Sequence, residues 1–178
     1  MVALALCLSG SSGGRPAIGG LPLSGEWFAL GYVHSVHHAP SAEIFTVGDD
    51  AFTMRAVVST SGGVLDYYAI EGQRSRLPGG MWVLWLDAPA TYTSLDLIAS
   101  PVGRRTLVSG RGCLPLFPSA GANAVRLELE TVAPGTPAQA CPEPYNQPFF
   151  LNTVYSQSDR ATRTAVDIQK PQGWPEPG

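Results

Sequence analysis

Short runs of apolar, β-branched and aromatic residues, separated by turns, are the feature that most constrains the fold of this chain. Its 178 residues include 20 glycines and 16 prolines, and both residue types end regular elements and favour turns. Runs with a period of two residues are typical of strands, whereas a helix needs apolar residues three and four positions apart. The pattern therefore predicts an all-β fold in which helix is the minority state.

Nine short strands are expected, and they suit a single antiparallel β-sandwich or open barrel with an irregular Pro/Gly-rich C-terminal extension. The expected strands are Trp27–Val36, Ala42–Val47, Ala51–Thr60, Val64–Ile70, Met81–Leu86, Thr91–Ala99, Arg105–Val108, Ala124–Val132 and Phe149–Tyr155. The run from Val125 to Val132 alternates, which places Leu127 inside and Glu128 outside. Met81–Leu86 is apolar on both faces, so we expect a central strand or one that meets a partner.

Three segments are expected along the chain. Residues 1–26 form an apolar start and a Ser/Gly linker, residues 27–155 a β domain, and residues 156–178 a Pro-rich tail. The start resembles the end of an export signal, which predicts a location in the periplasm or on the outer face of the cytoplasmic membrane. Cys7 follows a run similar to a bacterial lipobox and is a lipidation candidate, with an uncleaved apolar anchor or a plain signal remnant as the alternatives.

The two remaining cysteines, Cys113 and Cys141, bracket a loop-rich stretch. In an exported protein such an even pair predicts a disulfide, and closing a loop of this size would contribute about 3 kcal/mol to stability. Two separately buried thiols in a reducing compartment are the alternative.

Composition narrows the classes of partner. Charged residues are 14 % of the chain, against roughly 25 % in average soluble domains. The net charge of −3 and the lack of a Lys/Arg run exclude a nucleic-acid partner. Few charges, the non-alternating Trp82 and Trp85, and irregular ends favour docking on a membrane protein complex, with the N-terminus as a further contact to the membrane surface.

All three histidines, His34, His37 and His38, fall in one short run that precedes Glu43. In an antiparallel hairpin, a register that pairs His34 with Glu43 would put both side chains on one face. Such a pair can serve general acid/base chemistry or can satisfy a half-buried histidine, and the structural role is commoner. Ser35 points to the opposite face, so a Ser-His-Glu triad is geometrically poor.

Other chemistry has weaker support in the sequence. His34, His37, His38 and Glu43 are weak candidates for metal ligands, because their spacing matches no known site. Arginines 104, 105 and 111 could bind an anion near one edge of the sheet, although solvated turn arginines are the commoner case. We therefore expect no cofactor, no metal and no enzymatic activity.

The chain resembles the DUF1850 family of small exported bacterial proteins over roughly residues 27–132. The resemblance is carried by Phe28–Val36 with its His-Ser-Val, by Pro40 and Glu43–Val47, by Phe52–Ser59 with Ser61–Gly63, and by Leu95–Gly103 to Leu107. It transfers three positions of the family motif as binding candidates: His34, Ser35 and Glu43.

The resemblance implies an accessory role, because the family has no assigned activity and its genes often neighbour TRAP-type transporters of the TAXI class. We expect a non-catalytic extracytoplasmic subunit that docks on a membrane complex. One alternative is a small-molecule- or metal-binding domain that assists TRAP-type solute uptake. Another is a structural subunit of an energy-converting or photosynthetic membrane assembly.

Overall fold

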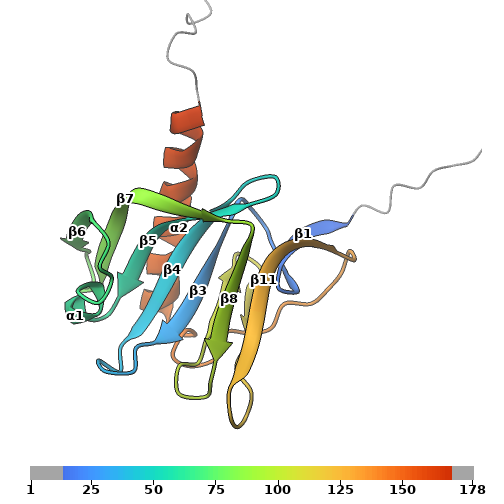
Figure 1. Ribbon diagram of the computed structural model, residues 1–178, viewed down its shortest axis with the longest axis horizontal. Helices are drawn as coiled ribbons and strands as arrows, with labels where there is room; N and C mark the ends of the chain where they lie inside the picture. The colour runs from blue at the N-terminus through green and yellow to red at the C-terminus, as the bar shows by residue number, and fades with distance from the viewer. Residues whose placement is uncertain (1–13, 170–178) are drawn as a thin grey trace, which may run out of the picture.

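The computed structural model describes residues 14–169, which form eleven strands and two helices (Figure 1). The strands are β1 (Arg15–Ile18), β2 (Leu21–Pro22), β3 (Trp27–Val33), β4 (Pro40–Val47), β5 (Phe52–Ser59), β6 (Gly72–Arg76), β7 (Trp82–Tyr92), β8 (Ser94–Ala99), β9 (Thr106–Ser109), β10 (Gly112–Pro115) and β11 (Asn123–Val132). The helices are α1 (Gly62–Leu65) and α2 (Pro148–Gln169).

The strands form two antiparallel sheets. The larger has seven strands in the order β10-β9-β3-β4-β5-β7-β6, and the smaller has four in the order β2-β1-β11-β8. The predicted all-β antiparallel sandwich is therefore confirmed. β7 leads directly into β8, so one continuous stretch of chain passes from the large sheet to the small one (Figure 1).

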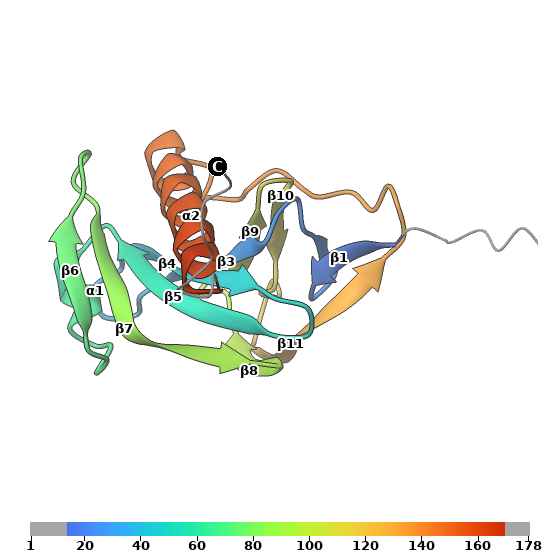
Figure 2. The same cartoon turned by 90° about the horizontal axis from the view of Figure 1, so that it is seen from above.

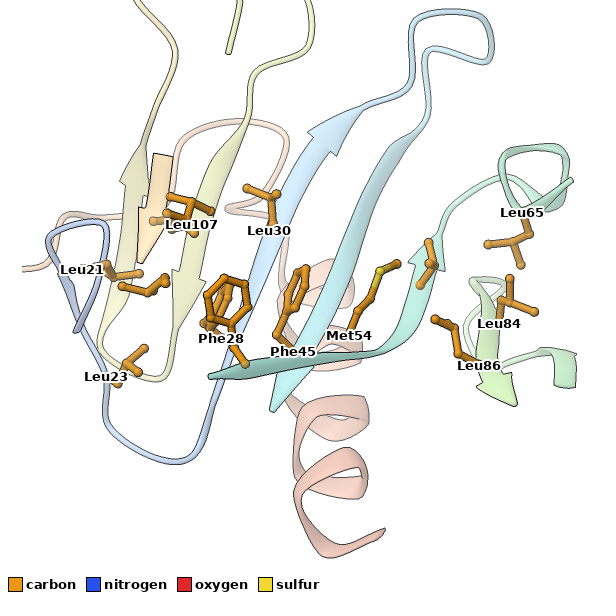
Figure 3. Close-up of a cluster of buried hydrophobic side chains, with 14 residues drawn as sticks. Leu21, Leu23, Phe28, Leu30, Phe45, Met54, Leu65, Leu84, Leu86 and Leu107 are labelled. Carbon is orange, nitrogen blue, oxygen red and sulfur yellow. The ribbon is translucent and has the colours of Figure 1, made fainter. Parts of the chain in front are cut away.

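The main core lies between the two sheets and is built largely from aromatic and leucine side chains (Figure 3). Phe28 on β3 stacks on Phe45 of β4 with ring centroids 4.8 Å apart, and Phe52 meets Phe28 edge-on at 5.3 Å. Leu107 and Leu127 bring β9 and β11 into the same cluster, and both are fully buried. These contacts hold the sheets together along the β3 and β9 side.

Helix α2 covers the other face of the large sheet, so the fold has three layers (Figure 2). Phe150, Val154 and Ala161 are fully buried against β3, β4 and β5, at the three-to-four-residue spacing of a helix. Pro148 is the first helical residue, a position where its missing N–H has no cost. The predicted strand over Phe149–Tyr155 is therefore wrong, because its short apolar run hides a longer helical period.

Other expected elements also differ from the structure. Val64–Ile70, predicted as a strand, is the end of α1 followed by a turn and an irregular segment. Four short strands, β1, β2, β6 and β10, were not expected, because they are too short or too polar to show a period of two.

Regular elements occur in two of the segments that were expected to be irregular. β1 and β2 pair within the small sheet although they fall in the expected linker over residues 1–26. Helix α2 runs to Gln169, well into the expected tail over residues 156–178. Cys7 lies outside the described residues.

The doubly apolar pattern of β7 is explained by its two covered faces. Leu84 and Leu86 pack into the core between the sheets, whereas Val83 and Trp85 belong to the cluster under α2. The Arg160 guanidinium of α2 lies 4.7 Å from the centre of the Trp85 ring. β7 is flanked by β5 and β6 on its two edges, so a partner chain is not needed to explain its apolar residues.

The segment between β11 and α2 returns to the large sheet, where a disulfide and a buried tyrosine attach it. The predicted disulfide between Cys113 and Cys141 is present and ties this segment to β10. Tyr145 is fully buried, and its ring packs so closely on Gly31 that a Cβ atom there would lie 2.9 Å from Cε1 of Tyr145. The Tyr145 hydroxyl donates a hydrogen bond to the Arg104 carbonyl at 3.0 Å.

Candidate functional site

A groove of about 1010 Å³ opens between the two sheets on the side of β8. Most of its wall is apolar and comes from five strands, β4, β5, β7, β8 and β11, with Phe45, Met54, Tyr92, Leu95, Leu97 and Val125 among the lining side chains. Its polar side chains are Glu43, Tyr68, Asp96, Arg105 and Arg126. A concave, largely apolar surface with a few polar groups is the common form of a small-molecule site.

Glu43 projects into this groove from the middle of β4. It is two residues from Phe45, so both side chains lie on the face of the strand that meets the small sheet. β4 is paired on both edges there, with Leu30 of β3 and Val57 of β5 opposite Glu43. Burial raises the pKa of the Glu43 carboxyl above its ordinary value of 4.5, against the smaller lowering effects of Tyr68 and Arg105.

Two tyrosines extend the polar group beside Glu43. The Tyr68 hydroxyl donates to Oε1 of Glu43 at 2.7 Å, and the hydroxyls of Tyr32 and Tyr68 lie 2.6 Å apart. Burial raises the pKa of Tyr32 to about 12 and raises that of Tyr68 further. Both phenols therefore stay neutral at physiological pH and act as hydrogen-bonding groups around the carboxyl.

Arg105 supplies the positive charge in this part of the groove. Its guanidinium lies 5.8 Å from the centre of the Tyr32 ring, and its Nε donates to the Ile98 carbonyl at 3.1 Å. Among residues 14–169, no carboxylate oxygen lies within 4.0 Å of the Arg105 guanidinium. Arg126, the second arginine of the groove, donates to both oxygens of Asp96 at 2.7 and 2.9 Å on the exposed rim.

The predicted pairing of His34 with Glu43 is wrong. The register places Leu30 opposite Glu43, and β3 ends at Val33, one residue before His34. A tight turn follows, closed by the His38 N–H donating to the His34 carbonyl at 2.7 Å. The expected strand over Trp27–Val36 is therefore shorter at its end, and Glu43 takes Tyr68 as its partner instead.

The three histidines occupy that turn and do not reach the groove. Nδ1 of His34 accepts the N–H groups of Val36 and His37, each at 3.3 Å. The His34 ring also packs edge-on against the Tyr67 ring, with centroids 4.7 Å apart. Partial burial lowers the pKa of His34, and the neighbouring His37 lowers it by a smaller amount. His34 therefore organises the turn and is not paired with Glu43.

The remaining candidates of the histidine run are exposed. Ser35, His37 and His38 all lie on the outside of the turn, and His38 adopts a left-handed φ of 50°. No cluster of three His, Cys, Asp or Glu side chains with metal-binding geometry occurs within residues 14–169. The weak candidates for metal ligands, His34, His37, His38 and Glu43, are therefore not brought together, because the turn separates the histidines from the carboxyl.

A family model described as "Domain of unknown function (DUF1850)" matches residues 28–116, which is half of the 178 residues. The chain belongs to the DUF1850 family. The DUF1850 segment runs from β3 to β10 and contains Glu43, Tyr68 and Arg105, whereas β11 and α2 lie beyond it. Comparison with curated proteins and with solved structures finds no match.

Three residues around Glu43 in the DUF1850 segment were not expected as a group. Tyr32 was noted only within the family motif, Tyr68 fell within an expected strand, and Arg105 was weighed as one of three turn arginines. A signal for Glu43 is present in the sequence, because it shares the period of two with Phe45 and Val47 and so must face the core. No local pattern indicates that Tyr68 and Arg105 approach the same carboxyl.

Replacing Glu43 by glutamine is expected to flatten the pH dependence of stability of this DUF1850 protein. Because burial raises the Glu43 pKa, the folded state retains its proton after the unfolded chain has lost it. The free energy of unfolding therefore falls as pH rises above 4.5, by up to about 1.4 kcal/mol per pH unit until the folded pKa is reached. In Glu43→Gln, which still accepts from Tyr68, this decline is lost.

Urea unfolding at a series of pH values measures the effect. Glu128→Gln, a change at an exposed glutamate of β11, is the matched control and should keep the wild-type decline. An equal decline in wild type and Glu43→Gln would show that the Glu43 carboxyl does not change its proton affinity on folding.

The Cys113–Cys141 disulfide is compatible with an extracellular or periplasmic location. In the part of the chain that the structure describes, no helix combines the length and hydrophobicity needed to cross a membrane.

Proposed function

We propose that this protein is a non-catalytic extracytoplasmic accessory protein that binds an amphipathic small molecule in the groove between its sheets. The observation that carries this proposal is the arrangement of Glu43, Tyr68 and Arg105 in a groove whose other walls are mainly apolar. The apolar walls suit the body of a ligand, and the polar group suits its head.

A binding role agrees with how the polar groups are held. Tyr68 is hydrogen-bonded to Glu43, and Tyr32 is hydrogen-bonded to Tyr68. The orientation of both phenols is therefore set before a ligand arrives. Burial keeps both phenols in their neutral form, in which they donate and accept hydrogen bonds without transferring charge. Pre-oriented polar groups favour recognition of a polar head, because little ordering is required on binding.

The disulfide and the resemblance of the N-terminus to an export signal support placement in the periplasm or on the outer face of the membrane. In that compartment, a carrier of small molecules fits a role beside a TRAP-type uptake system, as the family resemblance implies. The bound molecule would be passed to a membrane partner or sensed on its behalf.

Binding of N-phenyl-1-naphthylamine, a neutral apolar dye that becomes fluorescent in apolar sites, tests this proposal. We expect saturable binding to the wild type and weaker binding to Leu97→Trp, because the larger side chain takes up part of the groove. Val102→Trp, at a position that is 69 % exposed and not part of the groove lining, is the matched control and should bind like the wild type. Equal binding by the two variants would contradict the proposal.

Docking on a membrane complex is the second candidate and is favoured by a separate observation. Val36, Tyr67 and Val102 are exposed apolar residues on three turns, with exposed fractions of 60 %, 59 % and 69 %. The turns adjoin one another, since His34 contacts Tyr67 and the Val33 N–H donates to the Gly103 carbonyl. Clustered exposed apolar side chains are typical of protein contacts.

Photo-crosslinking in intact cells separates this candidate from the first. A crosslinker at position 102 should capture a membrane protein, whereas one at the exposed Glu128 should not. Equal capture at both positions would count against a docking surface on these turns.

A further inference from the structure

We infer that the groove selects organic carboxylates with an apolar body, whose carboxylate pairs with Arg105 and accepts a hydrogen bond from the acid form of Glu43. This inference rests on the proposed binding function and names the ligand class for that site. It follows from the charges in the groove, from the fact that, among the described residues, Arg126 is paired with a carboxylate and Arg105 is not, and from the shape and apolar character of the wall.

Arg105 is the group that favours an anionic ligand. Its Nε is already engaged by the Ile98 carbonyl, which fixes the plane of the guanidinium and leaves its terminal amino groups as donors. No carboxylate of residues 14–169 lies within 4.0 Å of it. A guanidinium held in one plane suits two parallel hydrogen bonds to a carboxylate.

Arg126 provides the contrast within the same groove. It is exposed on the rim and already makes two hydrogen bonds to Asp96, its cross-strand neighbour. Because this pair satisfies its own charges, neither member requires a charged ligand group. The head of an anionic ligand is therefore directed to Arg105 and away from the rim.

Glu43 determines what kind of anion the site accepts. One of its oxygens accepts from Tyr68, which leaves the second oxygen as the position for a proton that can be donated to a ligand. The groups that face it are Tyr32 and Tyr68 on one side and Tyr92, Arg105 and the Asp96–Arg126 pair around the groove. A second carboxylate beside Glu43 is repelled unless Glu43 is protonated, so binding takes up a proton.

Burial supports this state of Glu43, because it raises the carboxyl pKa. A bound carboxylate would raise that pKa further through like-charge repulsion. A cationic head, in contrast, would be attracted to ionised Glu43 but repelled by Arg105. The positive charge of Arg105 therefore favours the anionic ligand.

The wall of the groove defines the rest of the molecule. Phe45, Met54, Tyr92 and Leu97 line it with aromatic and flexible apolar surface. At about 1010 Å³ the groove is large for a small metabolite and is open along one side. A ligand with an extended aliphatic or aromatic body suits this wall better than a compact, fully polar acid.

Calorimetric titration with three probes of equal chain length tests the inference: decanoate, decanol and decylamine. We expect decanoate to bind most tightly. Arg105→Met should weaken its binding by about tenfold or more, Arg105→Lys should weaken it less, and Arg126→Met should change it by less than about threefold. Urea unfolding of each variant identifies any loss that comes from misfolding.

The pH dependence tests the role of Glu43. Decanoate affinity should fall as pH rises above the Glu43 pKa of the free protein, by up to about tenfold per pH unit until the higher Glu43 pKa of the complex is reached. In Glu43→Gln the affinity should no longer depend on pH, because the amide N–H replaces the acid proton as a permanent donor.

The outcomes separate this inference from the proposed function. If decanol binds as tightly as decanoate, if decylamine binds more tightly, or if Arg105→Met leaves decanoate affinity unchanged, the carboxylate inference is overturned while the groove remains a binding site. A decanoate affinity that does not fall with pH overturns the role of Glu43. Failure of all three probes and of N-phenyl-1-naphthylamine to bind overturns both.

Discussion

Replacing Tyr145 by alanine is expected to lower the free energy of unfolding by about 3–5 kcal/mol, the usual cost of removing a large buried ring. Tyr145 is fully buried against Gly31 and lies 5.5 Å from the Phe150 ring, so its removal leaves a cavity between β3 and α2. Because Gly31 has no side chain, it cannot fill that space. Urea unfolding followed by circular dichroism measures the loss.

Tyr145→Phe is the matched control, because it keeps the ring and removes only the hydroxyl. Its cost should be about 1 kcal/mol, since the Arg104 carbonyl still accepts from the Thr106 hydroxyl at 3.0 Å. A loss below about 1 kcal/mol in Tyr145→Ala would show that the segment before α2 adds little to the stability of the sandwich.

Removing the disulfide in the double variant Cys113→Ala/Cys141→Ala should lower the free energy of unfolding by about 3–4 kcal/mol. The two cysteines are 28 residues apart, and joining them restricts the unfolded chain over that loop. The loop contains all of β11, so its restriction also limits how far β11 can separate from β10 in the unfolded chain. Chemical denaturation under oxidising conditions measures the difference.

A reducing agent provides the matched comparison. It should destabilise the wild type by a similar amount and should leave the double variant unchanged. The opposite pattern, with a wild type insensitive to reduction, would mean that loop closure contributes nothing to stability.

The buried Tyr145 and the Cys113–Cys141 disulfide also affect the groove. Arg104, whose carbonyl receives the Tyr145 hydroxyl, adopts a left-handed φ of 47° and directly precedes Arg105. A non-glycine residue in that conformation is held by its surroundings. The segment between the disulfide and α2, which lies beyond the DUF1850 match, therefore helps to orient the arginine that we propose as the ligand partner.

Most of the sandwich could be predicted from local patterns. The alternation in β11 identifies Leu127 as a core residue, and the doubly apolar run in β7 identifies a strand covered on both faces. Turn residues such as Gly48 mark the hairpin between β4 and β5. These features depend on backbone geometry within a few residues, so a single sequence contains them.

Helix α2 and the partner of Glu43 were harder to predict from the sequence, for a common reason. In α2 the buried positions are spread over twelve residues from Phe150 to Ala161, with polar residues between them, so the short run at its start is read as a strand. The partner of Glu43 depends on a hairpin register that a local turn sets and on a tyrosine 25 residues away. Local periodicity reflects neither the spread of the buried helix positions nor a contact between residues so far apart in the sequence.

The sequence by itself determined the β-rich class, because turn residues and a period of two are local features, and it predicted the pairing of Cys113 with Cys141 from the count of cysteines, a pairing that the structure confirms. Only the tertiary structure decided that His34 closes a turn, that α2 covers the back of the sheet, and that Tyr68 and Arg105 approach Glu43. The physical reason is that long-range contacts are selected by packing of the whole core, which no short stretch of chain specifies.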